Sequence, residues 1–532
     1  MHFEMDRWND RCTILVKAAA FGLCAAVFAA ASVAAHAADP LTVKIADGTV
    51  HGKTLNEGKV RAFQGIPYAA PPVGNLRWAP PAPAKPWSGE LDATKYGHHC
   101  AQNHVFDDMV FQDAASPDDK GSEDCLTVNV YTPANAKGKL PVMFWIHGGG
   151  YTGGGSSEPR HNGDFLPTYG VVLVTINYRL GVFGFLALPE LAAQQGGASG
   201  NYGLMDMVAA LQWVKQNIGA FNGDPNNVTI FGESAGSFAV STLMAAPSAQ
   251  GLFTHAIGES GGALASGGLA MQTLAVRGPK EEEWVTSTGA KTMGELRAIP
   301  TDKILDLASK TSREERFSPV IDGKFIPKPI VDIYKAGEQA KVPLLSGFNH
   351  DEGSFLSIGM TADKWHAMGV QKYAEQAQEF FKLYPGGTDT DAVKSASDFG
   401  GDQFIAYGTW KWIEIDRQTG DKDIYRYKLD LAAPPSKFHP GSFAFHSDDI
   451  EYVFGTLATR PGATWRPEDW ELSKEMMGYW TNFAKTGDPS GPGLPNWPKY
   501  GEGDPVLHLD HPIAVRNDEN RGRYEFWLRE EK

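Results

Sequence analysis

A serine between two glycines is the strongest chemical signal in this 532-residue sequence. It lies in the segment Gly232–Gly236 (GESAG), which follows a strand-like apolar run and precedes a helical stretch, Phe238–Ala245. The glycines allow a sharp strand-to-helix turn from which a serine hydroxyl protrudes. A helix that opens there also directs backbone N–H groups at the reacting centre. Ser234 is therefore the candidate nucleophile.

A second segment, Gly258–Gly262 (GESGG), carries the same Gly-x-Ser-x-Gly pattern around Ser260. It follows the short apolar run 255–257, but the stretch 261–268 after it is rich in glycine and offers no helix to open. We therefore expect Ser260 to be at most a hydroxyl beside the reacting centre, and not its nucleophile.

His147 and three successive glycines, Gly148–Gly150, follow the apolar run Val142–Ile146. Glycines let the backbone approach a substrate carbonyl and point N–H groups at it, as an oxyanion hole requires. A phosphate-binding loop is the other chemistry that such a run supports. However, no Lys-Ser or Lys-Thr follows, and no acid stands at ribose-binding distance. The run therefore favours an oxyanion hole over a nucleotide site.

Alternating strand-like and helical patterns must position these groups. Short β-rich runs lie at Thr127–Tyr131, Val142–Ile146, Val171–Asn177, Val228–Phe231, Val342–Gly347 and Ile424–Leu429. Between them, apolar residues recur at helical spacing over Leu204–Val214 and Leu472–Phe483. The first helix is expected to stop near Gly219, before a turn at Gly223–Pro225. This alternation predicts an α/β fold with a mostly parallel central sheet and helices on both faces.

Two stretches, 261–316 and 363–402, are less strand-like, and we expect them to form helical cover over the site. Open α/β sheets place their chemistry at the carboxyl ends of the strands. No repeat, low-complexity tract or flexible linker divides the chain. The sequence therefore predicts one large domain over residues 38–532.

The N-terminal segment is typical of a secretory signal peptide. Lys17 is followed by an Ala-rich apolar run, Ala18–Ala35, and by the small-residue signature Ala35-His36-Ala37. A retained membrane anchor is the alternative, although the run is at the short limit of a span. We expect cleavage after residue 37, and hence a periplasmic or extracellular protein. No later segment is long and apolar enough to span a bilayer.

Removal of the signal peptide leaves two cysteines, Cys100 and Cys125. In an oxidising compartment such a pair predicts one disulfide bond. Two buried thiols are the alternative. A zinc site with His98 and His99 lacks a second cluster at ligand spacing, so we expect no metal.

The charge balance limits the partners. With 48 Lys and Arg against 63 Asp and Glu, the net charge is −15. Nucleic acids and anionic membranes need clustered basic residues, so neither is expected to be the main partner. The oligomeric state is not encoded in these patterns.

The sequence resembles the type-B carboxylesterase family of the α/β-hydrolase superfamily, which includes cholinesterases and bacterial para-nitrobenzyl esterases. The resemblance covers nearly the whole mature chain. It rests on segments that occur in family order: 63–68 (FQGIPY), 122–126 (SEDCL), 148–150 (GGG), 177–179 (NYR), 200–204 (GNYGL), 223–225 (GDP) and 232–236 (GESAG). It implies an oxyanion hole of the amides of Gly149, Gly150 and Ala235, and it matches Cys100–Cys125 to the family's first disulfide. Arg77 and Glu123 resemble its structural ion pair.

The resemblance also supplies the rest of a catalytic triad in the order Ser, acid, His. Asp351 and Glu352 follow the run Val342–Gly347, and spacing alone does not choose between them; the family motif implies Glu352. The segment 445–455 matches the family's histidine motif and implies His446 as the base, with His439 as its rival.

Some neighbours of the triad match the family and others depart from it. Glu233 and Ser260 match positions that the family places beside the triad. Ser447 stands where many relatives have Gly, and Glu259 where relatives often have Gln.

The implied function is hydrolysis of carboxylic esters through an acyl-enzyme, without a cofactor, on a small-molecule substrate. A detoxifying esterase or amidase for a bulky substrate is the alternative among enzymes. A non-catalytic binding or adhesion protein is the alternative of another class, but this chain retains the serine, the acid, the histidine and the glycine run.

Overall fold

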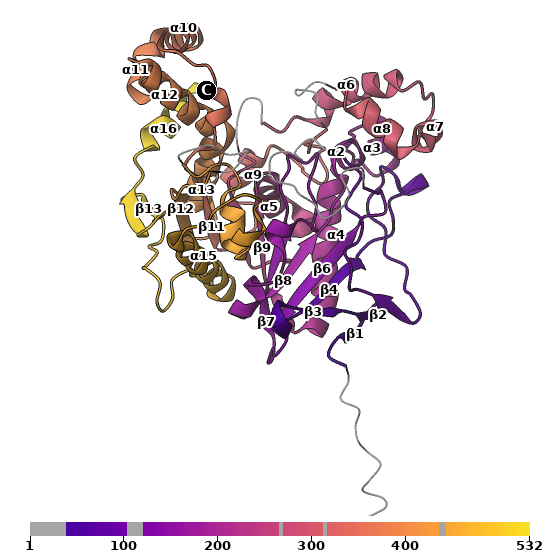
Figure 1. Cartoon of the computed structure of the whole chain (residues 1–532). Coiled ribbons are helices and arrows are strands. Elements are labelled where there is room, and N and C mark those ends of the chain that lie inside the picture. Colours follow the sequence, from indigo (N-terminus) through magenta and orange to yellow (C-terminus); the bar gives the residue numbers. More distant parts are fainter. Residues whose placement is uncertain (1–38, 104–120, 265–269, 312–316, 436–442, 532) are drawn as a thin grey trace, which may run out of the picture. The chain divides into compact units, whose positions relative to one another are not determined.

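An eleven-stranded sheet runs through the protein (Figure 1). The structure is a computed structural model and describes residues 39–103, 121–264, 270–311, 317–435 and 443–531. The predicted signal peptide, 1–37, and His439 lie outside these ranges. In order across the sheet, the strands are β14 (Ala514–Asn517), β13 (Pro505–Leu509), β12 (Ile424–Leu429), β11 (Leu344–Asn349), β10 (His255–Glu259), β9 (Gly223–Glu233), β7 (Leu140–Ile146), β8 (Val172–Ile176), β6 (Thr127–Pro133), β4 (Val60–Pro67) and β3 (Lys53–Leu55).

The central strands of this sheet are parallel, from β8 through β7, β9, β10, β11 and β12 to β13. The strands at the two sides, β6, β4, β3 and β14, pair antiparallel with their neighbours. The prediction of a mostly parallel sheet is therefore confirmed. Because β7, β9, β10 and β11 run the same way, the segments that follow them meet at one edge of the sheet.

Helices and three short further strands complete the described chain. The helices are α2 (Gly181–Phe185), α3 (Pro189–Gln194), α4 (Tyr202–Asn217), α5 (Ala235–Ala245), α6 (Leu274–Ser287), α7 (Met293–Ala298), α8 (Thr301–Ala308), α9 (Ile330–Lys335), α10 (Ala362–Tyr373), α11 (Ala377–Leu383), α12 (Asp389–Gly401), α13 (Tyr407–Thr419), α14 (Asp449–Phe454), α15 (Pro467–Thr486) and α16 (Arg521–Glu530). The short strands are β1 (Thr42–Ile45), β2 (Gly48–His51) and β5 (Glu90–Asp92).

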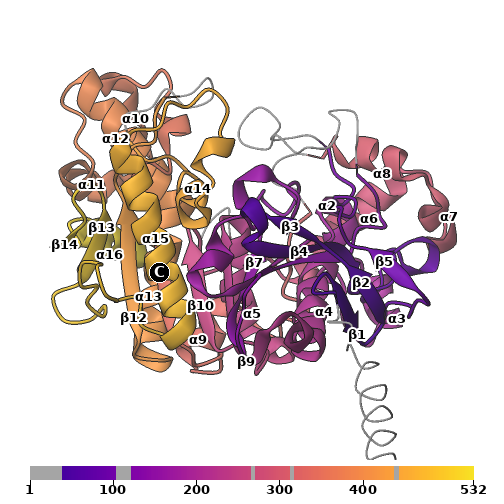
Figure 2. The same cartoon turned by 60° about the horizontal axis from the view of Figure 1, so that its bottom comes forward.

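Alternate residues of the central strands feed two hydrophobic cores. Phe144 and Ile230 lie in a core with residues of α4 and α5, whereas Trp145 and Phe231 lie in a second core with residues of α14 and α15. Successive side chains of a strand point to opposite faces, so a strand buried on both faces needs apolar residues throughout. Helices therefore cover both faces of the sheet, as expected; Figure 2 shows α15 from another side.

Both stretches expected to be helical contain helices. Residues 261–316 include α6–α8, and residues 363–402 include α11, α12 and all of α10 except its first residue; both groups lie at the top of Figure 1. α12 packs against the 3₁₀ turn η9 (Ser354–Leu356), which begins two residues after Glu352. This places helical structure next to the predicted catalytic acid.

One local prediction is wrong. Gly223–Pro225, expected as a turn, begins β9, because Gly223 pairs with Leu140 of β7. The chain reverses earlier, in the 3₁₀ turn η5 (Ile218–Phe221), and Asn222 takes the left-handed conformation with φ +67°. Asparagine tolerates that conformation, so it ends the helix without a glycine.

The disulfide bond and the buried ion pair that the sequence suggested are both present. Cys100 and Cys125 form a disulfide bond. Arg77 donates to both carboxylate oxygens of Glu123, from Nε at 2.8 Å and from Nη2 at 2.5 Å. Across the described ranges, we find no helix with the length and apolar character needed to cross a membrane.

Candidate active site

Ser234 lies at a sharp turn between β9 and α5. Its backbone is in a strained region, with φ +54° and ψ −121°. The glycines on either side are required by packing, because a Cβ on Gly232 or Gly236 would lie 2.5 or 2.0 Å from the carbonyl oxygen of Ile146. The local sequence therefore forces β9 and α5 close to β7 and leaves the serine half-buried at the edge of the sheet.

The glycine run after β7 lies against this turn. A Cβ on Gly148 would stand 3.2 Å from the Cβ of Ser234, so the backbone of the run passes directly beside the serine. Gly149 and Gly150 have positive φ, +100° and +60°, which explains why side chains are disfavoured there. Ala235 follows Ser234 at the start of α5. The three predicted oxyanion residues thus lie on the two segments that meet at Ser234.

His446 connects the serine to a carboxylate. Its Nε2 lies 2.9 Å from Ser234 Oγ, and its Nδ1 lies 2.5 Å from Glu352 Oε2. The glutamate is 3% exposed, whereas the histidine side chain is 18% exposed. When the Nδ1–H group donates a hydrogen bond to Glu352, the other ring nitrogen, Nε2, is unprotonated and can accept the serine proton.

The geometry separates Glu352 from its neighbour Asp351. The Asp351 N–H pairs with the Ala444 carbonyl, and its Oδ1 accepts a hydrogen bond from Ser397 at 2.6 Å. Glu352 instead presents its second oxygen, Oε1, to Ser260 Oγ at 2.7 Å and to the Asn349 N–H at 2.8 Å. Ser260 is fully buried, and its hydroxyl donates to this carboxylate.

Further buried carboxyls surround His446. Glu233 Oε1 lies 3.4 Å from His446 Nε2, and Asp449 accepts hydrogen bonds from Tyr427 Oη and Asn349 Nδ2. Burial raises the pKa of both Glu233 and Asp449. Burial alone would lower the pKa of His446, but the carboxylates of Glu352 and Glu233 outweigh it and raise that pKa above its ordinary value.

Glu259 is a fourth buried carboxyl, at the end of β10. Its Oε1 accepts a hydrogen bond from Trp480 Nε1 at 2.7 Å. Burial, with Asp449 as the next cause, raises its pKa well above the ordinary value. A protonated carboxyl is close in shape and hydrogen bonding to an amide, so a Gln side chain would make the same contact with Trp480.

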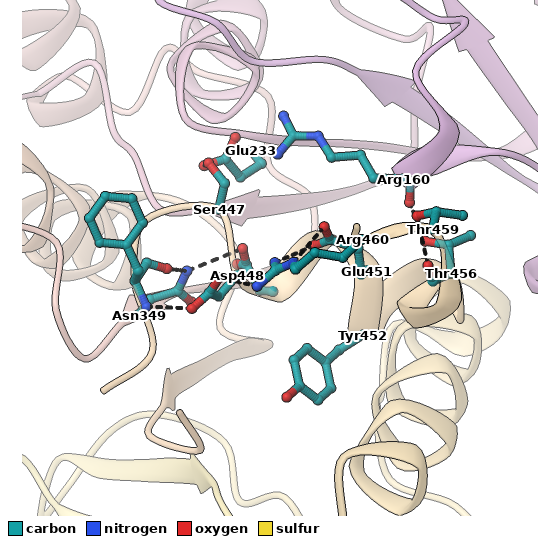
Figure 3. A network of polar contacts seen from close by, with 12 residues as sticks. Arg160, Glu233, Asn349, Ser447, Asp448, Glu451, Tyr452, Thr456, Thr459 and Arg460 are labelled. Carbon is teal, nitrogen blue, oxygen red and sulfur yellow. Dashed lines mark hydrogen bonds and ion pairs between the residues drawn. The ribbon is translucent and has the colours of Figure 1, made fainter. Parts of the chain in front are cut away.

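A polar network that the sequence patterns did not reveal holds the loop of the base (Figure 3). Asp448 accepts from the Phe445 N–H at 2.8 Å, and Arg460 binds Asp448 Oδ1 at 2.7 Å and Glu451 Oε2 at 2.8 Å. Asn349 Nδ2 donates to the Phe445 carbonyl at 2.7 Å. The histidine motif itself contains Asp448 and Glu451, but Arg460 lies beyond it and carries no sequence signal of its own.

Aromatic side chains lie on one side of the base. The Phe404 ring is 5.1 Å from the His446 ring, and Phe355 packs edge-on against Phe404 at 5.8 Å. Phe404 belongs to a π-helical turn, η11 (Asp402–Ala406), a local irregularity that is frequent at functional sites. Phe355 is 41% exposed, so the apolar surface extends outward from the base.

The arrangement can activate a hydroxyl for attack on a carbonyl carbon. It combines a partly accessible serine, a base within hydrogen-bond distance, a buried carboxylate behind the base and a glycine run beside the serine. In the part of the chain that the structure describes, no group of three or more His, Cys, Asp or Glu side chains is arranged to hold a metal ion.

Comparison with known proteins gives a consistent result. The sequence profile of the carboxylesterase family matches residues 39–527. A fumonisin B1 esterase from Sphingopyxis macrogoltabida is 34% identical over 494 residues, which cover 88% of this chain and 86% of that protein. The liver carboxylesterase of Sus scrofa is 36% identical over 525 residues, covering 89% of this chain and 90% of that protein.

The fold comparison agrees. A solved structure of a PNB esterase superposes with a TM-score of 0.78 at 32% sequence identity. The match covers 91% of this chain and 99% of that one. The similarity therefore extends over most of this chain.

Proposed function

This chain belongs to the carboxylesterase family and is a carboxylic ester hydrolase, and from that premise we propose that it works through Ser234, His446 and Glu352 as a catalytic triad. The observation that carries the proposal is the continuous line of contacts from Ser234 Oγ through His446 to Glu352. The contact between Ser234 and His446 has the donor–acceptor distance that proton transfer requires, and the contact between His446 and Glu352 orients the imidazole.

In this mechanism Ser234 Oγ attacks the ester carbonyl while His446 Nε2 takes its proton. The amides of Gly149, Gly150 and Ala235 would bind the oxyanion that forms. Nε2 then returns the proton to the departing alcohol, leaving an acyl-serine. A water molecule, deprotonated by the same nitrogen, releases the acid and restores the serine. Glu352 remains ionised and stabilises the transient imidazolium.

We also propose that the enzyme is exported. The predicted signal peptide at 1–37 would leave a single domain, 38–532, in the periplasm or outside the cell. The disulfide between Cys100 and Cys125 supports this location, because such bonds persist in oxidising compartments. Sequencing the N-terminus of the exported protein tests it; a protein that retains residue 1 would contradict the proposal.

The apolar surface of Phe404 and Phe355 beside His446 favours esters with uncharged, apolar groups. A specialised esterase for one bulky substrate is a second candidate, favoured by the similarity to the protein named fumonisin B1 esterase. Rates on p-nitrophenyl esters of increasing acyl length, compared with fumonisin B1, distinguish a broad esterase from a specialised one.

The test of the triad is a matched pair of variants, Ser234→Ala and Ser260→Ala. Loss of the nucleophile lowers kcat by roughly 10⁶-fold. Loss of Ser260 removes one hydrogen bond from Glu352, worth about 1.5–3 kcal/mol, so its effect is limited to roughly ten- to hundredfold. The proposal fails if Ser234→Ala keeps its rate, or if Ser260→Ala is the inactive variant.

A further inference from the structure

Ser447, the residue after the base, pays a conformational cost. It is buried and has φ +73°, in the left-handed region that favours glycine. A non-glycine residue there costs of the order of 1–2 kcal/mol. The serine side chain makes an interaction that offsets this strain.

That interaction is with Glu233. Ser447 Oγ donates to Glu233 Oε1 at 2.7 Å, and Figure 3 shows the two side chains directed at each other, with Arg160 on the far side of the carboxylate. The same oxygen lies 3.4 Å from His446 Nε2. Glu233 is only 1% exposed, so neighbouring groups rather than water decide whether it is ionised.

The groups around Glu233 oppose one another. Glu352, Asp449 and Glu259 supply further carboxyls, from the segment after β11, from α14 and from β10. Each of these carboxylates that is ionised favours the protonated form of its neighbours. On the other side, His446, Arg160 of the 3₁₀ turn η3 (Pro159–His161) and the Ser447 hydroxyl all favour the carboxylate form of Glu233.

We propose that Ser447 is a positioning residue: its hydroxyl holds the Glu233 carboxylate beside His446 and keeps it ionised. This inference rests on the proposed triad. An ionised Glu233 next to Nε2 stabilises the imidazolium that forms when Ser234 gives up its proton. Without the hydroxyl, Glu233 binds a proton more readily, its charge is lost, and the imidazolium is less stable.

The readout is the acid limb of the kcat/KM pH profile, since it reports protonation of the base. Ser447→Ala and Ser447→Gly both remove the hydroxyl, and Ser447→Gly also relieves the backbone strain, so at least one folded variant is expected. We expect both variants to move the midpoint of this acid limb to lower pH by roughly one unit. This is the lower end of the pKa shift that one neighbouring charge produces. Glu233→Gln should move it in the same direction.

The double variant Ser447→Ala/Glu233→Gln decides whether Ser447 acts through Glu233. We expect it to show no shift beyond that of Glu233→Gln alone. An unmoved midpoint in both Ser447 variants, a shift to higher pH, or additive shifts in the double variant would overturn the inference. Failure of the triad itself would appear separately, as full activity of Ser234→Ala.

Discussion

The loop that carries His446 depends on a buried ion-pair network centred on Arg460, and we predict that Arg460→Met damages both stability and catalysis. Arg460 binds Asp448 and Glu451, whose side chains are 5% and 2% exposed. Asp448 in turn accepts from the Phe445 N–H, next to the base. Methionine keeps most of the aliphatic volume but leaves both buried carboxylates without their cation.

Breaking a buried pair by removing one partner costs about 3–5 kcal/mol, because a buried charge is left uncompensated. For a chain of this length the unfolding entropy is about 1 kcal/mol/K, so the loss corresponds to a fall in Tm of about 3–5 °C. A small displacement of the base also lowers kcat, by roughly ten- to hundredfold. Urea unfolding, thermal unfolding and ester hydrolysis measure the three effects.

Arg529→Met is the matched control. Arg529 pairs with Glu379 on the surface, where the two side chains are 52% and 50% exposed. Exposed pairs of this kind contribute about 0–1 kcal/mol. If the two methionine variants lost the same stability, or if Arg460→Met kept the full kcat, the argument that this network positions the base would be refuted.

Two further predictions concern pH. His446 must be neutral to accept the serine proton, and Glu352 and Glu233 raise its pKa. We therefore expect kcat/KM to rise with pH through a midpoint above the ordinary histidine pKa of about 6.5. A midpoint below that value would contradict the geometry. Burial raises the pKa of Glu259, so the folded state binds more protons there than the unfolded state, and stability falls as pH rises through the ordinary glutamate range. Glu259→Gln, which keeps the oxygen that accepts from Trp480, should therefore be more stable than the parent protein in urea at pH 7 but not near pH 4, and an equal difference at both would contradict the assignment.

The elements that carry the site were predictable because their signals are local. Strands buried on both faces need continuous apolar runs, so β7, β8, β9, β11 and β12 were located from composition alone, with shifts of a few residues at their ends. The glycines around Ser234 were informative because each relieves a contact with a neighbouring strand. A close backbone contact of this kind is visible in the sequence because it requires a glycine.

The choice between Asp351 and Glu352 was not local. Adjacent side chains in an irregular segment point in different directions, and which one faces His446 depends on the pairing of Asp351 with the segment 444–445. That pairing joins residues more than ninety positions apart. Only the family motif indicated Glu352, which is the one of the two that contacts His446.

The two Gly-x-Ser-x-Gly segments show where motif reasoning reaches its limit. Ser234 and Ser260 share a φ of +54°, and each stands at the end of a parallel strand. This angle and this place in the sheet therefore do not distinguish them. The difference lies in what each hydroxyl meets: Ser234 is half-buried and faces the Nε2 of His446, whereas Ser260 is enclosed and donates to Glu352. The sequence indicates a helical stretch directly after Ser234 and a glycine-rich one directly after Ser260, and this one difference was enough to select the serine that contacts His446.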